Sequence, residues 1–316
     1  MEYIKVPGVD KPISPITLGC DSKPFRYGED LSILLDDICA CGVTTFDTAR
    51  GYAKSESVIG RWMKSRDNRE QVVIISKCCM PLGYINRVKV KNIRKDVERS
   101  LLELQTSYID ILYIHRDCQK EDPVALLLEM NELVKEGKVR AIGVSNWTYQ
   151  RIRIANEYAK AHDLIPFTVS SPAYSLAHFE RDPWKGSDGC ISIQDNQEEL
   201  AFYKTKEVAL FPYSSLARGF FAGKYPHDDP AFKATLDRAS RVSYYSERNL
   251  GRLARAEELA KQKGLTPASI NVAYMHSQGF ALSNVIATIN PKRMAQNLEA
   301  ASLRLTEEEL RYLEGE

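Results

Sequence analysis

Short apolar runs alternate with helical stretches along the whole chain, and this alternation limits the fold more than any other feature of the sequence. Several of the runs are almost entirely apolar, as expected for parallel strands that are buried on both faces. Eight strands alternating with helices in about 300 residues favour a (β/α)8 TIM barrel over an open doubly wound sheet. The expected strands are residues 16–20, 44–47, 72–77, 109–115, 141–145, 167–171, 208–213 and 284–288.

The stretches between these runs have a helical period. Apolar residues fall on one stripe within residues 30–41 and again within residues 92–104. Asp122 followed by Pro123 is typical of a helix start, with the aspartate as N-cap and the proline in the first turn. No G-x-G-x-x-G motif follows a strand, which disfavours a doubly wound dinucleotide-binding fold.

The organisation of the chain indicates one domain. No low-complexity linker or charge block interrupts it, so we expect residues 1–316 to form a single barrel domain. Two connections are long, at about 176–200 and 223–248, and both follow late strands. On a barrel, both loops would overhang the C-terminal face, where barrel enzymes carry their active sites.

Composition excludes several classes of partner. The 43 Lys and Arg residues nearly balance 42 Asp and Glu residues, and a net charge of +1 gives no indication of a nucleic-acid or anionic-membrane partner. No apolar run approaches the ~18 residues of a transmembrane helix. The seven cysteines are scattered, odd in number and without zinc-site spacing, so we expect a reduced cytoplasmic protein with no metal site.

Polar residues stand where several expected strands end. Asp47, Lys77, His115 and Ser145 end four successive strands, and Tyr52 follows the first of them by five residues. Each residue alone has an ordinary explanation, such as a helix cap, a solvated lysine or a satisfied core histidine. The set is harder to explain in this way, because the C-terminal ends of barrel strands converge on one rim, where barrel enzymes assemble their sites.

These residue types are suited to giving a proton to a carbonyl group. A tyrosine with a pKa near ~10 is a poor acid unless a neighbouring ammonium, such as Lys77, lowers that pKa. Asp47 would keep Lys77 charged, and His115 would orient the carbonyl oxygen or help to relay the proton. A hydride would have to come from a cofactor, since no side chain can donate one.

The sequence resembles the aldo-keto reductases over essentially its whole length. The family's D-T-A-x-x-Y is similar to DTARGY here, and its G-K-V-R-x-I-G-V-S-N is similar to GKVRAIGVSNW. Its strand that ends in the active-site Lys is similar to IISK, and its strand that ends in the active-site His is similar to LYIHRD. The resemblance implies a (β/α)8 barrel with NADPH lying across its C-terminal face. It also implies that Asp47, Tyr52, Lys77 and His115 are the catalytic tetrad of an NADP-dependent oxidoreductase, with Tyr52 as the general acid in the direction of reduction.

The same resemblance implies cofactor-binding residues one position at a time. Ser145 and Asn146 match the pair that binds the nicotinamide carboxamide, and Tyr213 matches the aromatic residue that stacks on the nicotinamide ring. Ser171 stands where the family normally has a Gln, three residues before Tyr174, so one carboxamide contact is shortened or passed to water. Other matched positions contact the pyrophosphate (Ser214, Leu216, Arg218), the 2′-phosphate (Thr288, Arg293) or the adenine (Gln296, Asn297).

The resemblance favours NADP over NAD. Arg293 provides the planar fork that suits a phosphate, and no acidic residue stands there to receive a ribose hydroxyl. Ala287 occupies a position where many relatives have Lys, so one phosphate contact is missing.

Aromatic residues after the expected strands are candidates for a substrate pocket, namely Phe25, Tyr27, Trp147 and Trp184. Aromatic walls suit a ring-bearing carbonyl compound or the face of a sugar, hence a small-molecule substrate. A basic cluster for an acidic substrate is not evident in the sequence.

We therefore expect NADPH-dependent reduction of an aldehyde or ketone. Two alternatives remain open: redox-neutral epimerisation or elimination through a transient ketone with retained NADP, and an NADPH-binding sensor or regulatory subunit with little turnover. A Schiff-base aldolase using Lys77 is disfavoured, because Asp47 would hold the lysine protonated. The sequence does not indicate the oligomeric state.

Overall fold

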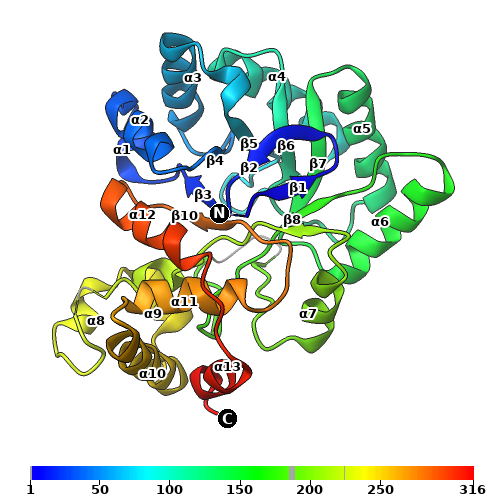
Figure 1. Ribbon diagram of the computed structural model, residues 1–316. Coiled ribbons are helices and arrows are strands. Elements are labelled where there is room, and N and C mark those ends of the chain that lie inside the picture. Colours follow the sequence, from blue (N-terminus) through cyan, green and yellow to red (C-terminus); the bar gives the residue numbers. More distant parts are fainter. Residues whose placement is uncertain (1, 185–188, 224) are drawn as a thin grey trace.

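Eight parallel strands form the barrel in the computed structural model, which describes residues 2–184, 189–223 and 225–316 (Figure 1). The strands are paired in the order β10-β3-β4-β5-β6-β7-β8-β9. The Leu210 amide donates to the Ala281 carbonyl (2.7 Å) and the Ser283 amide to the Leu210 carbonyl (2.9 Å), which joins the two edges of the sheet. The strands are β3 (Ile16–Gly19), β4 (Thr45–Asp47), β5 (Val73–Cys78), β6 (Ile109–Ile114), β7 (Val139–Ser145), β8 (Val169–Ser171), β9 (Ala209–Leu210) and β10 (Asn284–Ile286). The predicted TIM barrel is confirmed.

Helices surround the strands, and further helices extend from the late connections (Figure 1). The ring and its early additions are α1 (Lys23–Tyr27), α2 (Ser32–Ala40), α3 (Ser55–Arg66), α4 (Val90–Leu104), α5 (Pro123–Lys135), α6 (Tyr149–Ala161) and α7 (Gln197–Lys204), with a 3-10 turn, η1 (Arg69–Gln71). The later elements are η2 (Ala217–Gly219), α8 (Phe232–Thr235), α9 (Arg238–Tyr244), α10 (Glu247–Lys263), α11 (Pro267–His276), α12 (Pro291–Ala300) and α13 (Glu307–Glu314).

Local sequence signals account for where these helices begin. Asp122 accepts a hydrogen bond from the Val124 amide (3.0 Å), with Pro123 at the first turn of α5 as expected. Thr306 and Glu309 form a reciprocal capping box at the start of α13. Each such cap satisfies amides that the first helical turn leaves without intrahelical partners.

Two apolar cores lie on the two sides of the sheet. Side chains such as Val73, Ile75 and Ile111 point inward and form the core inside the barrel. A second, larger cluster packs between the strands and the helices and contains the fully buried Trp62 and Trp147. Because the barrel interior is filled by side chains, polar groups can gather only at its ends.

An antiparallel hairpin that the sequence did not predict lies across the centre of the view in Figure 1. Its strands are β1 (Ile4–Val6) and β2 (Val9–Ile13), and Val6 and Ile13 belong to the same apolar cluster as the barrel interior. Lys11 of β2 pairs with Asp110 at 3.0 Å and donates to the Tyr108 hydroxyl at 2.9 Å. Since Asp110 lies near the start of β6, the hairpin closes the N-terminal end of the barrel and leaves the C-terminal face open.

No helix in the described ranges is both long and apolar enough to cross a membrane. The single domain expected for residues 1–316 stays a prediction, which one cooperative unfolding transition would support.

Candidate active site

Four neighbouring strands bring the polar residues to one rim. Asp47 is the last residue of β4, Lys77 the next to last of β5, and Ser145 the last of β7, while His115 directly follows β6. These four strands are consecutive in the parallel sheet, so their C-terminal ends lie side by side. Tyr52 comes from the turn after β4, where its amide donates to the Ala49 carbonyl at 3.0 Å.

The small residues of this turn have a steric reason. A Cβ added at Gly51 would lie 1.9 Å from the Met80 sulfur and 2.9 Å from the Met80 Cβ, so any side chain here would require Met80 to move. The left-handed backbone of Ala53 (φ 51°) then turns the chain toward α3. The result is that Tyr52 is held back over the ends of β4 and β5.

Lys77 is the centre of the polar contacts in this site. Its ammonium forms a short ion pair with Asp47, donates to the Thr48 carbonyl at 2.9 Å and to the Tyr52 hydroxyl at 3.4 Å. The His115 ring packs edge-on against the Tyr52 ring, with centroids 5.6 Å apart and an interplanar angle of 78°. Asp47, Lys77 and His115 are buried, whereas Tyr52 is partly exposed.

Burial and charge set the protonation states of these groups. Burial lowers the pKa of Lys77, but Asp47 and Tyr52 outweigh it and raise that pKa above its usual value. Burial and the nearby charge of Lys77 hold the pKa of His115 well below its usual range, so the imidazole is neutral at neutral pH. Burial raises the pKa of Tyr52 to about 12 against the opposing effect of Lys77. The expected net lowering of the Tyr52 pKa is therefore absent, because desolvation is the larger effect.

The residues matched to the nicotinamide lie beside this group. The Ser145 hydroxyl donates to the Ser171 carbonyl (2.7 Å), and the Asn146 amide nitrogen donates to the His115 carbonyl (3.3 Å). The Tyr213 hydroxyl donates to the Asn146 side-chain oxygen (2.7 Å), so these residues form a connected polar patch. The Ser171 hydroxyl is buried with no hydrogen-bond partner among the described residues. Such a group fits a polar ligand like a carboxamide, because a buried polar atom without a partner is costly.

The loop matched to the pyrophosphate has an unusual backbone. Ser214, Ala217 and Arg218 all have left-handed conformations, with φ of 54°, 48° and 54°. Leu216 lies between them, directly before η2, and is partly buried against the outer core. The Arg218 guanidinium pairs with Asp237 at 2.7 Å.

The residues matched to the adenosine end gather at the start of α12. Arg293 and Gln296 are exposed, Thr288 is partly exposed and Asn297 is buried. The Asn290 side chain caps α12 by accepting from the Arg293 amide at 3.1 Å. A helix N-terminus with an exposed arginine is suited to a phosphate group.

The four aromatic candidates for the substrate pocket have different surroundings. Phe25 and Trp147 are fully buried in the outer core, and Trp147 packs against Phe167. Tyr27 and Trp184 are exposed, at 69% and 37%. Two of the four have basic neighbours. The guanidinium carbon of Arg151 lies 4.9 Å from the buried Trp147 ring centroid, and those of Arg116 and Arg218 lie 5.7 Å and 5.4 Å from the centroid of the exposed Trp184.

Sequence reasoning missed Arg116 and Cys190. Arg116 directly follows His115, and its guanidinium lies 2.6 Å from the sulfur of Cys190, which belongs to the connection between β8 and α7. The signal was present in the motif LYIHRD, where an arginine stands next to the histidine that ends the strand. Nothing in the sequence indicated that Trp184 and Cys190 would approach it.

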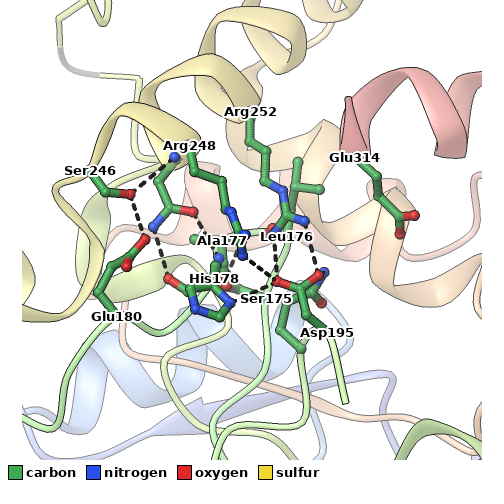
Figure 2. A network of polar contacts seen from close by, with 12 residues as sticks. Ser175, Leu176, Ala177, His178, Glu180, Asp195, Ser246, Arg248, Arg252 and Glu314 are labelled. Carbon is green, nitrogen blue, oxygen red and sulfur yellow. Dashed lines mark hydrogen bonds and ion pairs between the residues drawn. The ribbon is translucent and has the colours of Figure 1, made fainter. Parts of the chain in front are cut away.

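The connection that carries Trp184 and Cys190 is fastened to α10 through Asp195 (Figure 2). The Asp195 carboxylate accepts from Arg252 (3.0 Å) and Arg248 (3.4 Å) and contacts the His178 ring nitrogen (2.7 Å). Arg252 also donates to the Leu176 carbonyl at 2.9 Å. Burial favours a raised pKa for Asp195, but Arg252 and His178 outweigh it and lower that pKa. Asp195 therefore serves as a charged anchor for the loop.

Comparison with known proteins agrees with the barrel and its rim. A sequence model of the Aldo/keto reductase family matches residues 17–315, so the chain belongs to this family. It is similar to norsolorinic acid reductase B of Dothistroma septosporum (28% identity, covering 96% of this chain and 78% of the relative). Other relatives are the protein tas of Escherichia coli (26%; 100% and 97%) and probable aldo-keto reductase 1 of Glycine max (29%; 95% and 84%). Family membership supports an oxidoreductase that uses a nicotinamide cofactor and acts on carbonyl groups.

Proposed function

We propose that the protein is an NADPH-dependent carbonyl reductase that converts an aldehyde or ketone to an alcohol, reversibly. The observation that carries the proposal is the position of the Lys77 ammonium, paired with Asp47 and 3.4 Å from the Tyr52 hydroxyl. A buried ammonium beside a phenol stabilises the phenolate that remains after the phenol gives up its proton.

Each residue of the tetrad has a separate task. Tyr52 donates its hydroxyl proton to the carbonyl oxygen as negative charge develops there. Lys77 stabilises the resulting phenolate, and Asp47 keeps the Lys77 ammonium charged and in place. His115, neutral because burial lowers its pKa, orients the carbonyl oxygen by a hydrogen bond without competing as an acid.

NADPH bound at the C-terminal face supplies the hydride. Ser145, Asn146 and Ser171 would hold its carboxamide, and Tyr213 would stack on its ring. The partnerless buried hydroxyl of Ser171 supports this assignment. The exposed guanidinium of Arg293 at the start of α12 favours NADPH over NADH, since it can bind the 2′-phosphate bidentately. Ser214, Leu216 and Arg218 would cover the pyrophosphate, and Thr288, Gln296 and Asn297 would complete the adenosine end.

The test is reduction of a panel of aldehydes and ketones with NADPH that carries deuterium at its transferable position. We expect NADPH oxidation with deuterium on the carbinol carbon of the product. Failure to oxidise NADPH with every compound would overturn the proposal. Conversion of a compound without net NADPH consumption would indicate the redox-neutral alternative instead, and hydride transfer limited to a single turnover would indicate a sensor.

The cytoplasmic location expected from the scattered cysteines stays a prediction. Fractionation of the native host and detection of the protein would test it.

A further inference from the structure

Arg116 is a half-buried cation next to the catalytic centre. It follows His115 at the rim, and its backbone carbonyl accepts a hydrogen bond from the Trp147 indole at 3.2 Å, which fixes the main chain. Its guanidinium contacts the Cys190 sulfur at 2.6 Å and lies 5.7 Å from the Trp184 ring centroid. Neither a thiol nor an indole face neutralises its charge.

The neighbouring acidic groups make their direct contacts elsewhere, although the charge of Asp182 helps to raise the pKa of Arg116. Asp182 accepts hydrogen bonds from the amides of Trp184 and Cys190, each at 2.8 Å. Arg218, the second cation at Trp184, pairs with Asp237 at 2.7 Å. Among residues 2–184, 189–223 and 225–316, no carboxylate oxygen lies within 4.0 Å of the Arg116 guanidinium, which is the distance limit for an ion pair.

The position of this charge relates it to the reacting groups. The Arg116 charge contributes to lowering the pKa of His115, after burial and Lys77, so the guanidinium is close enough to act on the imidazole. It also opposes the burial that raises the pKa of Tyr213. Arg116 therefore lies within electrostatic reach of both the carbonyl-orienting group and the proposed nicotinamide-stacking group.

A guanidinium has five N–H donors in a planar fork that matches a carboxylate, and a half-buried cation gains most from a partner of opposite charge. Next to it, Trp184 offers an aromatic face with 37% exposure. We propose that Arg116 binds a carboxylate carried by the carbonyl substrate, and that Trp184 packs against an aromatic ring of the same molecule. The substrate class is therefore an aromatic aldehyde or ketone with an acidic substituent, an inference that rests on the proposed reductase function.

The experiment compares two substrates that differ in one charge, 4-carboxybenzaldehyde and its methyl ester. For each enzyme variant, kcat/KM is measured for both compounds with NADPH, and the ratio of acid to ester is the readout. We expect the wild-type ratio to exceed one and Arg116→Met to lower it by about 10–100-fold. The size of this effect follows because a hydrogen bond to a charged group is worth about 1.5–3 kcal/mol, and each 1.4 kcal/mol changes kcat/KM about tenfold. Arg116→Lys should restore part of the preference, because it keeps the charge without the fork.

Two controls separate this role from others. Arg153→Met removes an exposed arginine of α6 and should leave the ratio unchanged. The dissociation constant of NADPH, from tryptophan fluorescence, should be equal in wild type and Arg116→Met. A large rise in that constant with an unchanged ratio would assign Arg116 to the cofactor and overturn the inference.

A ratio near one in the wild type, or one unaffected by Arg116→Met, would also overturn it. In both cases turnover of the ester would still support the proposed reductase. If neither compound nor any other carbonyl is reduced, the reductase proposal itself fails.

Discussion

Replacing Asp195 by Asn should destabilise the protein by about 2–3 kcal/mol at neutral pH. The substitution keeps the shape of the side chain but removes the charge shared by Arg252, Arg248 and His178. The Arg252 side chain is only 6% exposed and would keep its bond to the Leu176 carbonyl without a counterion. Breaking a buried pair by removing one partner costs about 3–5 kcal/mol, and we reduce this figure because Asp195 is 32% exposed and partly screened by water.

Urea unfolding of wild type and Asp195→Asn at several pH values measures this effect. The folded-state pKa of Asp195 is lowered, so its stabilisation is present above the unfolded pKa of about 3.9 and is lost as the pH falls through the folded pKa. The difference between the two proteins should be present at about pH 5 and shrink below about pH 4, where the Asp195 carboxylate becomes protonated. Glu157→Gln is the matched control, because its pair with Arg153 is exposed and worth at most ~0.5 kcal/mol. The reasoning is refuted if Asp195→Asn costs no more than the control, or if the difference persists unchanged in acid.

Three further outcomes are expected. The His115 pKa is far below its usual range and the Tyr52 pKa is about 12, so kcat for reduction should be level between about pH 6 and pH 9. A step near pH 6.5 in the pH profile of kcat would contradict a neutral histidine. Arg293→Met should weaken NADPH binding about tenfold and leave NADH binding unchanged in fluorescence titrations; equal losses for both cofactors would contradict a 2′-phosphate contact. Gly60→Ala should lower the free energy of unfolding by about 1–3 kcal/mol, because its Cβ would lie 2.4 Å from a backbone oxygen of α4. Gly251→Ala, whose Cβ would meet only a flexible guanidinium at 3.4 Å, should raise that free energy by up to about 1 kcal/mol. Urea unfolding measures both. Equal effects of the two glycine substitutions would show that the close approach at α4 is not limiting.

The barrel and the positions of the tetrad were predictable because each depends on a local pattern. Buried parallel strands give short apolar runs, and a polar residue at the end of such a run must lie at the rim once the strands are parallel. Asp47, Lys77 and His115 follow this logic, and the structure brings them together with Tyr52. The strand expected at 208–213 is shorter, at Ala209–Leu210, because beyond it Tyr213 pairs with Ala173 through an isolated bridge only.

Other features depend on contacts between distant segments and could not be read from a pattern. The strands of the N-terminal hairpin are short, and its place is set by Val6 and Ile13 entering the barrel. The raised pKa of Tyr52 reflects burial, which depends on the whole fold. The cluster at Trp184 brings Arg116, just after β6, near Arg218 of η2 through a connection with no periodic signal. Arg116 was therefore visible in the sequence while its surroundings were not.

The central claim is that Tyr52 provides the proton for a carbonyl reduced by hydride from NADPH. Its most direct test is Tyr52→Phe, with turnover of a reducible aldehyde and the NADPH dissociation constant measured on the same preparation. Loss of a general acid predicts a fall in kcat of about 10²–10⁴-fold with NADPH binding nearly unchanged, because the phenol acts on the proton and not on the cofactor. Turnover at the wild-type rate in Tyr52→Phe would contradict the account.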